Sequence, residues 1–168
     1  MTSTTHHETQ IVSDPDVPLV RIVREFDAPV EKVFRAHTDP DLVVQWLGPR
    51  NLTMTIDHFD CRTGGSYRYI HSRDGEDSRE DFAFHGSFHE VRPNEVIVQT
   101  FTFEGFPDQV ALERLVLEDL GDGRSRLTAT SLVDSFADRD AFVASGMETG
   151  VVEGYERLDE VLSRTGAN

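Results

Sequence analysis

A chain of 168 residues can bury one sizeable hydrophobic core and is too short for two ordinary ones. Its formal net charge of -15, with no basic patch to offset it, repels phosphate backbones and anionic headgroups, so nucleic acid is excluded as an expected partner. Because Cys61 is the only cysteine, an intramolecular disulfide and a cysteine-based metal cluster are excluded as well.

The N-terminal segment, residues 1–17, is polar and has neither the basic start nor the apolar core of a signal peptide. We expect it to be a disordered tail, followed by one domain over residues 18–164 and a short C-terminal tail over 165–168. No apolar run approaches the roughly 20 residues that a membrane-spanning helix needs. The sequence therefore predicts a cytoplasmic protein that does not insert into a membrane.

Alternation of apolar and polar residues predicts a first strand over residues 19–26. Two short helices follow, each with proline in its first turn, and the second ends at Gly48-Pro49. Turn residues then separate six further strands, which makes seven in total. These six strands cover residues 52–60, 66–72, 81–91, the segment after the turn at Pro93-Asn94, 110–120 and 124–133.

The last stretch, residues 147–162, has apolar residues at helical spacing and glutamates on the opposite arc. This pattern predicts one long amphipathic helix, which covers the apolar face of the sheet. Gly150 and Gly154 lie inside the apolar arc, and each costs about 1 kcal/mol relative to alanine. Close packing of the helix and open space for a ligand are the two explanations.

The register of the hairpin at Pro93-Asn94 predicts which residues face one another across two strands. Centring the turn on these two residues pairs Phe84 with Phe103 and Phe88 with Gln99. The aromatic residues then share the inner face of the sheet, which the helix covers.

Polar residues interrupt this inner face. The registers place Gln99, Glu113 and Ser131 on the inner faces of three successive strands, with Glu90 on the strand before. A buried polar group without a hydrogen bond costs about 1–3 kcal/mol, so these groups bind one another, water or a ligand. A slip of one residue at the Gly105-Pro107 turn would send Glu113 outward and remove the row.

Five sequence motifs together resemble, in order and spacing, the landmarks of the SRPBCC superfamily (START and birch-pollen-allergen-like proteins). The resemblance is closest to the branch of the activator of heat-shock ATPase homologue family, and it covers about residues 19–163. The motifs are Trp46–Pro49, Asp60–Gly65, His85–Val91, Gly146–Glu148 and Tyr155–Leu158.

This resemblance implies an α+β helix-grip fold, in which a seven-stranded curved antiparallel sheet wraps around a long C-terminal helix. It also implies a hydrophobic pocket between sheet and helix that binds a small apolar or aromatic molecule. Combining it with the registers, we expect the ligand-binding residues to be Trp46, Tyr67, Tyr69, Phe84, Phe88, Gln99, Phe101, Glu113, Leu115, Ser131, Met147, Val151, Gly154 and Tyr155.

Two further functions stay open beside ligand binding. The first is a polyketide cyclase-like or aromatase-like enzyme, in which an inward Glu113 or His71 moves protons. The second, implied by the branch name alone, is a domain that regulates a chaperone ATPase. Trp46 either stacks on a ligand or anchors the second short helix.

We expect no cofactor and no metal site. His85 and His89 lie four residues apart on one strand, about 13 Å, which is too far for one metal ion. The sequence leaves the oligomeric state open.

Overall fold

One curved antiparallel sheet, accompanied by four helices, makes up the computed structural model, which describes residues 7–76 and 78–165. The strands are β1 (Gln10–Ser13), β2 (Leu19–Phe26), β3 (Thr53–Phe59), β4 (Ser66–Asp74), β5 (Arg79–Arg92), β6 (Val96–Phe103), β7 (Ala111–Gly121) and β8 (Arg124–Leu132). The helices are α1 (Val30–Thr38), α2 (Pro40–Trp46), α3 (Phe136–Ala144) and α4 (Met147–Thr165). The strand order is β1-β2-β8-β7-β6-β5-β4-β3.

Local sequence signals set the limits of the later helices. The Asp39 carboxylate accepts the backbone N–H of Asp41 at 3.0 Å and caps α2. The Ser135 hydroxyl accepts the backbone N–H of Asp138 at 3.1 Å and caps α3. Gly146, with φ of 89°, then ends α3 and separates it from α4. The segment before the long C-terminal helix is therefore a short helix in its own right.

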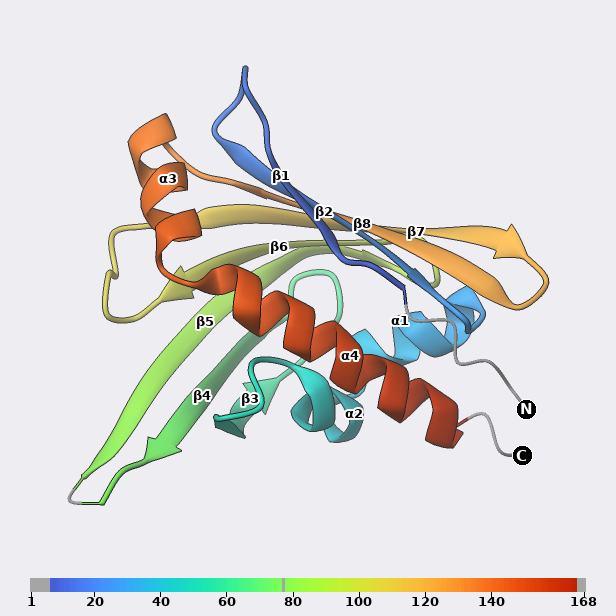
Figure 1. The fold of residues 1–168 in the computed structure, drawn as a ribbon, viewed down its shortest axis with the longest axis horizontal. Coiled ribbons are helices and arrows are strands. Elements are labelled where there is room, and N and C mark those ends of the chain that lie inside the picture. Colours follow the sequence, from blue (N-terminus) through green and yellow to red (C-terminus); the bar gives the residue numbers. More distant parts are fainter. Residues whose placement is uncertain (1–6, 77, 166–168) are drawn as a thin grey trace.

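The long helix α4 crosses the inner face of the sheet (Figure 1). Helices α1 and α2 both contact α4, and α3 leads into its N-terminal end. This arrangement of one antiparallel sheet and a C-terminal helix fits the predicted α+β helix-grip fold.

The prediction of seven strands is wrong, because β1 is an eighth strand within the described residues. It lies in the segment 1–17 that the sequence pattern assigns to a disordered tail. Pairing with β2 satisfies backbone groups along the edge of the sheet, and Ile11 packs against the core from the inner face. Four residues with one apolar anchor are too short a pattern to be recognised in a polar segment.

The turn between β5 and β6 differs by one residue from the prediction. Arg92 pairs with Val96, so the connection is the three-residue loop 93–95, in which Asn94 has φ of 65°. Asparagine tolerates this left-handed conformation better than most residues. Farther from the turn, the predicted pairing of Phe84 with Phe103 is confirmed.

A β-bulge between Phe88 and Glu90 reconciles the longer loop with the predicted inner face. Phe88 still pairs with Gln99, whereas Glu90 pairs with Val98. Glu90 therefore leaves the polar row in which the sequence pattern places it. Its carboxylate instead lies 3.2 Å from the Arg92 guanidinium in an exposed ion pair.

The most deeply buried part of the core lies under the C-terminal half of α4. It includes Phe26, Leu127 and Leu158, each 0% exposed. Arg24 is also enclosed here, and its guanidinium binds Asp159 of α4 through two contacts of 2.5 and 3.2 Å. This ion pair ties α4 to β2, and the sequence pattern does not reveal it because its members are 135 residues apart.

Candidate functional site

Gln99, Glu113 and Ser131 form one row across the inner face of the sheet. Gln99 is the β-sheet partner of Glu113, and Glu113 is the partner of Ser131, which confirms the predicted registers. Phe88 of β5 and Val20 of β2 end the row on its two sides, and both are buried. The row thus places three polar side chains inside an apolar surface.

Hydrogen bonds join these groups into a directed network. The Ser131 hydroxyl donates to Glu113 Oε2 at 2.6 Å, and Gln99 Nε2 donates to Glu113 Oε1 at 3.1 Å. Gln99 Nε2 also lies 3.3 Å from the Tyr67 hydroxyl, which donates to the Thr100 carbonyl at 2.7 Å. Both oxygens of the Glu113 carboxyl are therefore engaged by neutral side chains.

Gly86 makes room for the Tyr67 hydroxyl between β5 and β6. A Cβ at this position would lie 2.7 Å from the Tyr67 hydroxyl and would collide with the Thr100 carbonyl. Tyr67, on β4, is the β-sheet partner of Gly86, and the absence of a side chain at Gly86 lets the tyrosine reach across β5.

Burial raises the pKa of the Glu113 carboxyl, although its bonds to Ser131 and Gln99 act in the opposite direction. Burial also raises the pKa of the Tyr67, Tyr69 and Tyr155 hydroxyls, and the negative charge of Glu113 raises each of them further. The field of this carboxylate therefore reaches phenols on both the sheet and α4.

A belt of half-buried apolar side chains flanks the network, and we call it the inner belt. On one side of the polar row lies Phe101, and on the other Leu115 pairs with Ala129. Phe84 stacks on Phe101 with ring centroids 5.3 Å apart. The full belt consists of Phe84, Phe101, Leu115, Ala129, Phe142, Val143, Met147 and Val151, all half-buried and all packed against the two core clusters.

Other predicted binding residues lie behind this belt. Tyr67, Tyr69 and Phe88 are between 2% and 6% exposed. The rings of Tyr67 and Tyr69 stack with centroids 5.9 Å apart. These side chains are therefore part of the buried second core cluster rather than of the half-buried belt.

Trp46 and Tyr155 belong to the closed end of the core. Trp46 is 5% exposed, its Nε1 donates to the Ala36 carbonyl at 2.8 Å, and its ring stacks on that of Tyr155 at 6.1 Å. These contacts favour the interpretation in which Trp46 anchors α2 to α1 and α4.

The two glycines of α4 face the segment after α2. A Cβ added at Gly154 would lie 3.4 Å from Gly48 N and from the Trp46 carbonyl, and one at Gly150 would lie 3.5 Å from Pro49 Cδ. Both glycines therefore lie against this segment with room for no more than a small side chain, which favours packing over open space for a ligand.

His71 is enclosed between β4 and the α2–β3 connection. It is 7% exposed, its ring hydrogen-bonds to the Leu47 backbone, and its Nε2 has no partner among the described residues. Burial lowers its pKa, so the imidazole is neutral at pH 7. Its ring Cε1 would lie 2.6 Å from a Cβ at Gly48, which leaves little room for a substrate.

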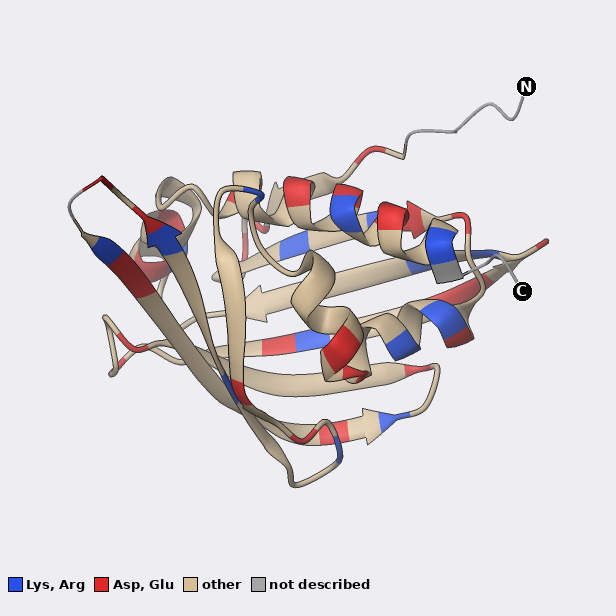
Figure 2. Ribbon diagram, turned by 90° about the horizontal axis from the view of Figure 1, so that it is seen from below, with Lys and Arg blue, Asp and Glu red and all other residues tan. Residues whose placement is uncertain are grey.

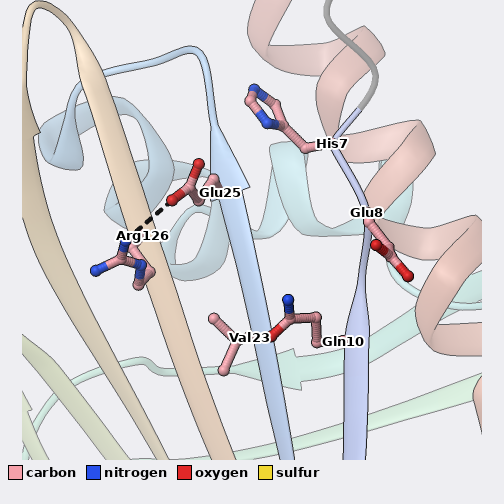
Figure 3. A pocket seen from close by; sticks show the side chains of 6 residues that line it. All are labelled: His7, Glu8, Gln10, Val23, Glu25 and Arg126. Atoms are coloured by element: carbon pink, nitrogen blue, oxygen red, sulfur yellow. Dashed lines mark hydrogen bonds and ion pairs between the residues drawn. The ribbon is translucent and has the colours of Figure 1, made fainter.

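Two surface pockets on the described chain lie away from the predicted site. One, of about 320 Å³, is lined by six residues of β1, β2, β8 and the segment before β1 (Figure 3). Its only cation, Arg126, already binds Glu25 at 3.0 Å. The other, of about 60 Å³, lies between α1, α2 and α4. The predicted cavity between sheet and helix is neither of these, and it stays a prediction.

Acidic residues predominate on the surface of α4, which has five acidic residues and two arginines (Figure 2). Cations from other segments compensate part of this charge, and Arg50 binds Glu160 at 2.7 Å. None of the described helices is long and apolar enough to cross a membrane.

Comparisons with known proteins identify the same architecture. The family model described as "Activator of Hsp90 ATPase homolog 1-like protein" matches residues 27–163. A comparison with curated protein sequences found no significant match.

Solved structures resemble the chain over nearly its whole length. A protein from Arthrobacter aurescens is 27% identical with a TM-score of 0.81, covering 92% of this chain and 91% of its own. A Rhodobacter sphaeroides protein is 26% identical with a TM-score of 0.80, covering 92% and 98%. Protein Ms6760 from Mycobacterium smegmatis, 23% identical with a TM-score of 0.81, covers 94% and 97% and shares the fold.

Proposed function

The chain belongs to the Activator of Hsp90 ATPase homolog 1-like family of the SRPBCC superfamily, and from this premise we propose that it binds a small apolar or aromatic molecule. The site is the inner belt together with the Gln99–Glu113–Ser131 row at its centre. The observation that carries the proposal is that this belt is only half-buried, although it lies on the face of the sheet that α4 covers. Apolar walls with a few convergent polar groups are typical of ligand sites.

Burial of the belt supplies the free energy of binding. Each Å² of apolar surface that a ligand removes from water contributes about 25 cal/mol. The polar row orients the ligand. A ligand that displaces water from these groups without forming hydrogen bonds to them leaves them unsatisfied and binds more weakly. An aromatic body of moderate size with one polar group matches both requirements.

A fluorescence titration with N-phenyl-1-naphthylamine, a neutral apolar dye, tests this proposal. Leu115→Ala, in the belt, should weaken dye binding about tenfold through lost apolar contact. Leu112→Ala is the matched control, since Leu112 lies on the opposite face of the same strand and is 44% exposed. Absence of dye binding to the unaltered chain, or equal loss in both variants, would contradict the proposal.

A polyketide cyclase-like enzyme is the second candidate, and the Glu113 carboxyl favours it. Its raised pKa allows it to hold a proton nearer neutral pH and to exchange that proton with a keto group. Incubation with a poly-β-keto thioester, followed by mass spectrometry, would detect cyclised product. Glu113→Gln should abolish that product if the carboxyl moves the proton, and unchanged turnover would argue against this role.

A further inference from the structure

Glu113 is a carboxylate on the inner face whose hydrogen-bond partners are neutral. Its oxygens accept from Gln99 and Ser131, and no Arg, Lys or His side chain of the described residues forms an ion pair with it. By contrast, the carboxylate of Asp159 on α4 is paired with the enclosed Arg24 guanidinium. Within the described residues, the Glu113 carboxyl thus has no counter-ion of its own.

The network has spare acceptors and no spare donors. Both N–H bonds of Gln99 are directed to Glu113 and to the Tyr67 hydroxyl, and the hydroxyls of Tyr67 and Ser131 are also engaged. Gln99 Oε1 accepts no hydrogen bond from the described residues, and the Glu113 oxygens retain lone pairs. A ligand therefore pairs with this row by donating hydrogen bonds.

Aromatic rings adjoin the carboxylate. Phe101 lies on β6 two residues after Gln99, which is the partner of Glu113, and its ring is half-buried. Phe84 stacks on both Phe101 and Tyr69, so Phe101 is the ring that a ligand would meet. Tyr67 touches the network through Gln99. The face of an aromatic ring attracts cations, and the attraction is stronger where water is excluded. Carboxylate and rings together favour the same kind of group, an organic cation.

We infer that the molecule bound at this site carries a protonated amine on its apolar or aromatic body. The ammonium group donates to Glu113 and to Gln99 Oε1, while the body lies against the inner belt. This inference rests on the proposed function and narrows the ligand class. Carboxylate and phosphate ligands are disfavoured, because their charge would meet that of Glu113.

Binding of such a ligand depends on pH in a defined direction. The ammonium needs the ionised Glu113, and burial raises the pKa of this carboxyl, so the amine binds more weakly as the pH falls toward that pKa. A neutral ligand lacks this dependence. The other titratable groups that interact with the carboxyl are the phenols of Tyr67, Tyr69 and Tyr155, which their raised pKa keeps neutral. Arg24, which is paired with Asp159, acts on the Tyr155 hydroxyl on the side of the closed end.

Calorimetric titration of the full chain with three matched probes tests the inference. The probes are 1-naphthylmethylamine, a cation, 1-naphthylmethanol, which is neutral, and 1-naphthylacetate, an anion. We expect the amine to bind about 10- to 100-fold more tightly than the alcohol, and the anion to bind most weakly.

Glu113→Gln should remove the advantage of the amine and leave the affinity for the alcohol unchanged. Glu118→Gln is the control, because Glu118 lies on the outer face of the same strand and its side chain is 59% exposed. If Glu113→Gln does not fold, the unaltered chain still provides a test. Its affinity for the amine relative to the alcohol should decrease as the pH is lowered.

Equal affinity for amine and alcohol, or an amine advantage that survives Glu113→Gln, would overturn the inference and leave the proposed function standing. If none of the three probes binds the unaltered chain, the proposed function fails with it.

Discussion

The two halves of α4 cover the same sheet, but they bury it to different extents. Under the C-terminal half, Leu158 and Phe26 are 0% exposed and Val161 is 2% exposed. Under the N-terminal half, Met147 and Val151 are only half-buried, as are the belt residues of the sheet. One helix therefore completes a core at one end and leaves a partly open wall at the other.

Neighbouring helices explain the difference. Helices α1 and α2 pack against α4 and close the C-terminal end, where Trp46 joins all three elements. At the N-terminal end α4 contacts α3, which is held to β2 through Arg139. The closed end supplies much of the buried core, and the proposed ligand site lies at the other end of the same helix, a division that can be tested.

Breaking the closed end at its ion pair should have the largest effect. Arg24→Ala removes an enclosed guanidinium and leaves Asp159 without its partner, so we expect a loss of about 3–5 kcal/mol in the free energy of unfolding. Urea denaturation measures it. Arg21→Ala is the matched control, because Arg21 lies on the same strand with its side chain 42% exposed, and it should cost at most about 1 kcal/mol. Similar losses in both variants would contradict the comparison.

Overpacking the contact between α4 and the segment after α2 should have an intermediate effect. Gly154→Leu forces a side chain toward Gly48 and the Trp46 carbonyl, and we expect a loss of about 1–3 kcal/mol in unfolding free energy. Dye affinity in the folded protein should stay unchanged, because this contact lies at the closed end. A variant of unchanged stability that no longer binds dye would instead place Gly154 in the ligand site.

The smallest effect is expected from the other glycine of α4. Gly150→Ala should raise the free energy of unfolding by up to about 1 kcal/mol, because the new methyl group makes an ordinary 3.5 Å contact with Pro49 and improves helix propensity. Thermal unfolding measures the gain. Gly146→Ala should have the opposite sign, since Gly146 has φ of 89° between α3 and α4. Loss of stability in Gly150→Ala would contradict this prediction and would mean that Gly150 and Pro49 lie too close together for a methyl group.

Periodicity and turn residues predict much of the fold and the centre of the candidate site. The row of Gln99, Glu113 and Ser131 follows from hairpin registers alone, because strand alternation and turn length together determine which side chains share a face. The bulge after Phe88 could not be predicted, since it only compensates for a loop one residue longer than expected. Strand β1 was missed because tertiary pairing with an edge, rather than its own pattern, makes it a strand.

By itself, the sequence determined the α+β class, the amphipathic helix and the polar row, since each depends on spacing along a short segment. Only the tertiary structure decided that Gly150 and Gly154 face the segment after α2, that Arg24 binds Asp159, and that the Glu113 carboxyl has neutral partners. The glycine contacts and the ion pair join segments more than 100 residues apart. The surroundings of Glu113 depend on which side chains several strands and α4 place around it. Local patterns encode which face of an element is apolar, whereas contacts between distant elements decide how completely that face is covered.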